Sequence, residues 1–211
     1  MDICLINALF PPDAYGGAES YVQRLAQALD ARGHNITVLT TKSDDKGDDP
    51  EINTSNNVDI CRIDPANLSH RSDGTGSNIF SKAIWHQINT ANPIAARKVG
   101  RLLDDLQPDV VHTNNLMGLT TLVGRSIHQR DIRHIHTLHD YSLICPKGTL
   151  LREWTAPDDE QKVCNNPPAP CKVYKKQQQL ALGQPDVVLA PSQHVIDVHW
   201  KHGMFEDAHT Q

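Results

Sequence analysis

The sequence has no long hydrophobic run, no surplus of basic charge and no glycine-rich dinucleotide fingerprint. Its apolar runs are of strand length, so we expect no segment that spans a membrane. The formal net charge is −5, which argues against a nucleic-acid partner because such proteins normally carry a basic patch. The pattern G-x-G-x-x-G is absent, which counts against a small NAD-dependent oxidoreductase. The N-terminus lacks the basic region of a signal peptide, so we expect a cytoplasmic protein.

Cysteine is scarce, and its number is odd. Five cysteines in a cytoplasmic candidate do not imply a disulfide framework. Cys145, Cys164 and Cys171 cluster in one long loop, but a structural zinc site normally shows four ligands with cysteines two to four residues apart. We therefore expect buried thiols or one occasional disulfide, and neither a metal nor another cofactor.

Apolar runs of strand length alternate with stretches of helical periodicity, and this alternation is typical of βαβ units around a parallel sheet. We therefore predict an α/β fold with a Rossmann-like, doubly wound parallel sheet, formed by one domain over residues 1–211. Strands are expected at 3–8, 35–41, 58–63, 109–112, 133–138 and 186–190.

The helical stretches come with recognisable start and stop signals. Gly33 is expected to end the first helix as a C-cap, and Asn92-Pro93 is expected to break the helical pattern over 79–106. Further helices are expected at 116–130 and 172–182, and Ser192 can N-cap a last helix. The polar stretches 42–57 and 64–77 are predicted to be surface loops, and 139–170 is a long segment with little periodicity.

Polar residues gather where the predicted strands end. In open parallel sheets ligands bind outside these carboxyl ends, so we predict a cleft wall there. The candidate residues are Tyr15, Gly16, Gly17, His112, Asn114, His139, Asp140, Tyr141 and Ser192.

Gly16, Gly17 and His139 suggest particular chemistry. Gly16-Gly17 opens a helix, where bare N–H groups can meet a phosphate, although a simple tight turn explains the pair equally well. His139 follows an apolar strand, so it can hydrogen-bond a sugar hydroxyl, and its position favours it over His128 or His209. For His112 a ligand contact and a contact to loop backbone are equally good interpretations.

Lysines at positions 172, 175 and 176 share one predicted helix. Such a cluster can meet an anionic membrane surface, but three lysines on a helix are more often a solvated face.

An ordered set of motifs resembles glycosyltransferase family 4. The motifs, in chain order, are Phe10-Pro11-Pro12, Gly16-Gly17-Ala18-Glu19, Arg32-Gly33-His34, Pro108-Asp109-Val110-Val111-His112, Leu138-His139-Asp140-Tyr141, Cys145-Pro146-Lys147-Gly148 and Ala190-Pro191-Ser192. Each motif is weak by itself, but the ordered set is specific and covers nearly the whole chain.

The resemblance implies one half of a GT-B fold, namely the N-terminal, acceptor-side domain of a retaining glycosyltransferase. It places Gly16 and Gly17 near the diphosphate of a nucleotide-sugar donor and His139 beside the transferred sugar. The acceptor, a glycan or a lipid-linked compound, is expected to lie against Tyr15, His112, Asn114, Asp140, Tyr141, Lys147 and Ser192. We expect the donor-binding half to be absent from this chain, and the chain alone to be inactive. The alternative is a non-catalytic acceptor-binding or regulatory module.

Overall fold

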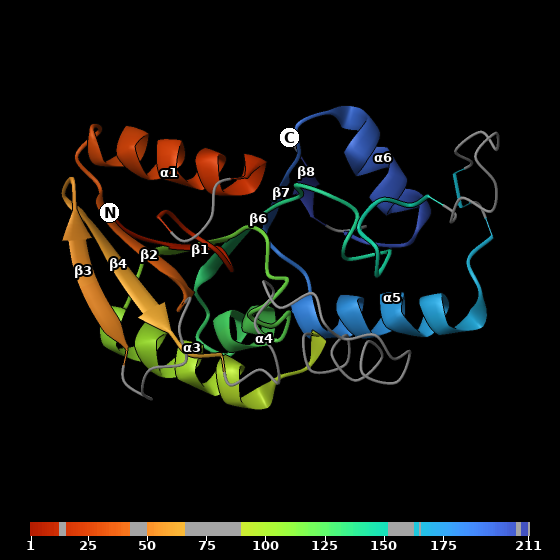
Figure 1. Cartoon of the computed structure of the whole chain (residues 1–211), viewed down its shortest axis with the longest axis horizontal. Coiled ribbons are helices and arrows are strands. Elements are labelled where there is room, and N and C mark those ends of the chain that lie inside the picture. The colour runs from red at the N-terminus through yellow and green to blue at the C-terminus, as the bar shows by residue number, and fades with distance from the viewer. Residues whose placement is uncertain are drawn as a thin grey trace.

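One sheet organises the computed structural model, which describes residues 1–12, 16–42, 50–65, 90–151, 163–164, 166–205 and 208–210 (Figure 1). Within these residues eight strands pair in the order β3-β4-β2-β1-β5-β6-β7-β8. Their bounds are β1 Asp2–Ile6, β2 Asn35–Thr41, β3 Glu51–Ser55, β4 Val58–Ile63, β5 Val110–Thr113, β6 Arg133–Thr137, β7 Val187–Leu189 and β8 His209–Thr210.

The strand order reverses beside β1. The chain passes from β1 to β2 and then β4 on one side of β1, whereas β5, β6, β7 and β8 follow one another on the other side. Every neighbouring pair is parallel except β3 with β4. This confirms the predicted α/β, doubly wound sheet, with one antiparallel strand added at its edge.

That edge strand corrects one prediction, because β3 lies inside the stretch 42–57 that we expected to be a loop. All its residues are exposed, so the sequence of β3 shows no alternation of apolar and polar side chains. Asn56 and Asn57 form the turn to β4 with φ angles of 49° and 61°. A two-residue hairpin turn with positive φ at both positions favours asparagine, so the Asn-Asn pair was the available signal.

Helices cover both faces of the sheet (Figure 1). They are α1 Gly17–Asp30, α3 Pro93–Leu106, α4 Val123–His128, α5 Ala169–Leu182 and α6 Gln193–Lys201. Val22 and Ala26 of α1 pack on Leu5 and Val38, whereas Val99 and Leu103 of α3 belong to a second core on the opposite face. In Figure 1 α1 lies above the sheet, and α3 and α4 lie below it.

The start of α3 confirms the predicted break at Asn92-Pro93. The side-chain oxygen of Asn92 accepts hydrogen bonds from the backbone N–H groups of Ile94 and Ala95, at 3.0 and 3.1 Å. Proline at the first helical position costs nothing, because its missing N–H has no partner there. The expected helical part 79–89 lies outside the described residues.

The helix predicted over 116–130 is much shorter, because α4 begins only at Val123. Gly118 has a φ of +106°, which a right-handed helix cannot contain. The hydroxyl of Thr120 accepts hydrogen bonds from the backbone N–H groups of Asn92 and Leu122. Leu116 and Leu119 are buried in this irregular turn, and their apolar spacing resembles that of a helix.

Two helix ends also differ in detail from the prediction. The first helix ends at Asp30, and Gly33 takes a φ of +80° in the turn that follows. Ser192 stands at the N-cap of α6, but its side chain makes no capping hydrogen bond. No helix within the described ranges is long and apolar enough to cross a membrane.

Candidate functional site

The candidate site lies at the reversal of strand order, beyond the carboxyl ends of β1 and β5. Hydrogen bonds continue past the two strands here. The N–H of Asn114 donates to the carbonyl of Ile6 at 2.8 Å, and that of Ala8 donates to the carbonyl of Asn115 at 2.7 Å. The N–H of Asn115 donates to the side-chain oxygen of Asn7 at 2.9 Å. The floor of the site is therefore fixed by the two central strands.

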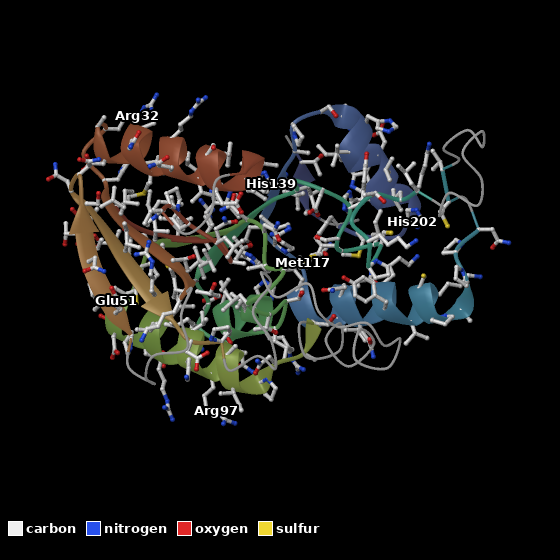
Figure 2. All side chains as sticks on the ribbon, viewed as in Figure 1. Arg32, Glu51, Arg97, Met117, His139 and His202 are labelled. Atoms are coloured by element: carbon white, nitrogen blue, oxygen red, sulfur yellow. The ribbon has the colours of Figure 1, made fainter. Side chains whose placement is uncertain are left out.

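A pocket of about 420 Å³, counted with its open mouth, begins on this floor. Its lining includes Asn114, Met117, His136, His139 and Asp140. Figure 2 shows His139 near the N-terminal end of α1, with Met117 further toward α4. The pocket is at the position where open α/β sheets bind ligands.

The ring of His139 is held by Asn114. The amide nitrogen of Asn114 lies 3.3 Å from the carbonyl of His112 and 3.5 Å from that of Ile6, and it must donate to them. Its amide oxygen is therefore the atom that lies 3.0 Å from Nε2 of His139. Nε2 then carries the proton, and in the neutral ring Nδ1 is left with a lone pair. No described residue makes a hydrogen bond to Nδ1.

Aromatic and acidic neighbours surround the same ring. Tyr21 of α1 contacts it edge to face, with ring centroids 5.1 Å apart. Burial lowers the pKa of His139, while the negative charges of Asp140 and Glu19 oppose that change. Desolvation is the largest of these effects, so we expect a neutral ring at pH 7.

Asp140 follows His139 on the pocket wall. Its Oδ1 accepts a hydrogen bond from the N–H of Ser142 at 2.8 Å, which shapes the start of the loop. Oδ1 is thus used by the loop backbone, whereas Oδ2, which would lie 3.8 Å from a Cβ at Gly148, has no hydrogen-bond donor among the described residues.

The two glycines at the start of α1 differ in their surroundings. Both are exposed, and Gly16 is the N-cap residue with an extended backbone. A Cβ at Gly16 would collide with the carboxylate of Glu19, which folds back over the helix N-terminus, whereas a Cβ at Gly17 would meet nothing within 4 Å. Neither glycine has a positive φ. The expected phosphate site is therefore open at Gly17 and faces a carboxylate at Gly16.

His112 lies under the pocket rather than in its lining. Its Nε2 is 2.7 Å from the hydroxyl of Thr137, and the side chain is buried. Burial, together with the neighbouring His139, lowers the pKa of His112 to about 4. The contact to Thr137 gives this histidine a role within the sheet.

The remaining candidates lie away from the pocket lining. Tyr141 stacks on the buried ring of His199, with centroids 5.7 Å apart. Lys147 is exposed on the loop after it, and Ser192 is exposed at the start of α6. Tyr15 lies outside the described residues.

Some lining residues were not predicted. Gln178 of α5 accepts a hydrogen bond from the hydroxyl of Thr121 and donates to that of Thr90 at 3.0 Å, deep under the pocket. His136 also lines it, and its Nδ1 is 2.8 Å from the hydroxyl of Thr113. A polar residue at an inward position of a strand was a signal for His136. No sequence signal pointed to Gln178, because tertiary packing brings α5 to the pocket.

The cysteines do not form a metal centre within the described part of the chain, where no three potential ligands come together. All five thiols are free. Cys145, Cys164 and Cys171 are half-buried, and burial raises the pKa of Cys171.

The Rossmann-like sheet with a polar pocket at its switch point matches one half of the GT-B fold. Sucrose-phosphate synthase from Thermosynechococcus elongatus has a similar fold, with a TM-score of 0.61 and 16% identity over 100% of this chain and 47% of that one. A trehalose-6-phosphate structure from E. coli, bound with UDP-2-fluoro glucose, gives a TM-score of 0.53 and 13% identity over 96% of this chain and 42% of that one.

The chain belongs to glycosyltransferase family 4, whose sequence profile matches residues 15–209. An uncharacterized 42.6 kDa protein in the cps region of Klebsiella pneumoniae is 36% identical over 152 residues, which is 72% of this chain and 40% of that protein. The chain thus spans less than half the length of these relatives.

Proposed function

We propose that this chain is the acceptor-side half of a glycosyltransferase that moves a sugar from a nucleotide-sugar donor to an acceptor hydroxyl with retention. Family membership supports glycosyl transfer, and the share of the relatives that the chain covers agrees with one half of a two-domain enzyme. A second half, on this or another chain, would hold most of the donor.

The single observation that carries this proposal is the fixed ring of His139. Asn114 determines its orientation and leaves Nδ1 as a hydrogen-bond acceptor at the pocket wall. A neutral histidine in this state can accept a hydrogen bond from a sugar hydroxyl and position the sugar for transfer. Such pre-organisation lowers the barrier because no ordering is needed during the reaction.

The charges on the described pocket wall indicate which half of the enzyme would stabilise the leaving group. The described lining contains no lysine or arginine. A diphosphate leaving group needs positive charge in the transition state, which on this proposal comes from the donor-binding half. The isolated chain should therefore be inactive. Turnover of roughly 1 per second or faster, across a panel of nucleotide sugars, would contradict this.

The proposal is tested by His139→Ala in the enzyme completed by its donor-binding half. We expect kcat/KM to fall about 10- to 1000-fold while the melting temperature changes little. His194→Ala, an exposed histidine on α6, is the matched control. Equal kinetics of His139→Ala and parent would refute the role, and retained sugar binding without any turnover in the parent would favour a binding module.

We further infer a polysaccharide or glycolipid product, made in the cytoplasm at the inner face of the membrane. Lys172 and Lys176 are exposed on α5 beside Val173 and Leu180, which are 56% and 64% exposed. Basic and apolar side chains on one helix face favour contact with anionic lipid. Sedimentation with vesicles of phosphatidylglycerol and phosphatidylcholine tests this, and equal sedimentation of a Lys172→Glu, Lys176→Glu double variant would contradict it.

A further inference from the structure

The sign of the charge around the pocket restricts the acceptor. Within the described lining, Asp140 is the only charged side chain at neutral pH. A second carboxylate, that of Glu19, acts on the same His139 ring from α1 and is 7% exposed. Both carboxylates act to raise the pKa of the ring, so the side-chain charges that act on it from the described residues are negative. A phosphate or a carboxylate on the acceptor would be repelled there.

The free oxygen of Asp140 indicates which groups are favoured instead. Ser142 fixes the carboxylate through Oδ1, so Oδ2 is held in place and can only accept hydrogen bonds. A sugar hydroxyl or an ammonium group donates to such an oxygen, whereas a phosphate dianion has no proton to donate. His139 directly precedes Asp140 in the chain. Its Nδ1 likewise accepts hydrogen bonds rather than donating them.

We propose that the acceptor site takes a neutral or amino sugar and excludes sugar phosphates, with Asp140 as the specificity-determining residue. This rests on the proposed function, because it names the class of acceptor that would lie beside the transferred sugar in the pocket of His139. The proposed acceptor class also differs from the sugar phosphates that appear in the names of two fold neighbours.

The test compares glucose, glucosamine and glucose 6-phosphate as probes of the 211-residue chain, with the His139 ring followed by NMR. We expect glucose and glucosamine to shift the His139 signals at about tenfold lower concentration than glucose 6-phosphate, which corresponds to about 1.4 kcal/mol. In Asp140→Asn, which keeps the oxygen facing Ser142, this gap should fall to about threefold or less. Asp197→Asn removes the same charge from α6 and should leave the gap unchanged.

A second measurement needs no variant. Raising the salt from about 10 mM to 1 M shortens the Debye length from about 30 to 3 Å, so the discrimination against glucose 6-phosphate should shrink. Binding of glucose 6-phosphate as tight as that of glucose overturns the proposal, and so does a His139 signal that none of the three probes shifts. In the completed enzyme, preferred transfer to sugar phosphates would overturn this proposal alone, whereas no transfer to any acceptor would overturn the proposed function.

Discussion

Replacing Asn114 with Asp tests whether this residue sets the state of His139. In the parent, the neutral amide oxygen lies 3.0 Å from Nε2. A carboxylate at that position would stabilise the imidazolium. Two unit charges about 4 Å apart interact by about 4 kcal/mol at an effective dielectric constant near 20, or about three pKa units.

The full effect will not be reached, because Asn114 is 2% exposed and burying its replacement raises the pKa of the new carboxyl group. We therefore expect the pKa of His139 to rise by about one to three units. A larger fraction of the rings would then be protonated at both nitrogens, and in these Nδ1 changes from acceptor to donor.

The assay is an NMR titration of the His139 ring in this chain, with the signal assigned through His139→Gln. Asn115→Asp is the matched control, because the side chain of Asn115 contacts the N–H of Met117 instead of the ring. A thermal melt must show that both variants fold. An unchanged or lowered pKa of His139 in folded Asn114→Asp would refute the assigned hydrogen bond.

Three further predictions concern other parts of the chain. Gly17→Val should weaken nucleotide-sugar use in the completed enzyme and leave the melt nearly unchanged, since a Cβ there meets nothing within 4 Å; unchanged kinetic constants would make the glycine only a turn. Burial lowers the pKa of His112 to about 4 and of His134 to about 3, so the unfolded chain binds more protons below pH 6.5. The free energy of unfolding should be largest above pH 6.5 and fall by about 1.4 kcal/mol per histidine for each pH unit between pH 6.5 and the folded-state pKa values of about 4 and 3. Equal urea melts at pH 7.5 and 5.5 would contradict this. Gly124→Ala should destabilise the fold by about 1–3 kcal/mol, because its Cβ would enter the backbone of α5, whereas Gly100→Ala meets only a movable arginine side chain and should melt closer to the parent.

Sequence patterns predicted the inner strands well because burial on both faces produces continuous apolar runs. The bounds expected for 35–41 and 58–63 are those of β2 and β4. The exposed edge strand β3 carries no such run, and it was missed. The turn before α4 was predicted to be helical because burial of Leu116 and Leu119 imitates helical spacing. The spacing of apolar residues indicates which side chains are buried. It indicates a helix only where the backbone is regular.

The site was predictable in part for a related reason. The rule that ligands bind at strand ends located His139, Asp140 and Asn114, which the structure brings into one pocket. The same rule selected Ser192, which lies away from that pocket's lining. Gln178 comes from a helix that packs under the sheet, and a single sequence does not show which helical residues reach a cleft. The hydrogen bond from His139 to Asn114 likewise depends on how the strands pair, because the two residues are 25 positions apart in sequence.

The hydrogen bonds that extend beyond β1 and β5 have a consequence for motion. Ala8, Asn114 and Asn115 tie the ends of the two central strands together through backbone and side-chain bonds. We expect these amides to be among the slowest in the chain to exchange with solvent, because the central pair of strands must separate first. We therefore expect the pocket floor to move less than the loops around it. Any closure around a bound sugar must come from the surrounding loops or from a facing domain, while the Asn114–His139 pair stays in place.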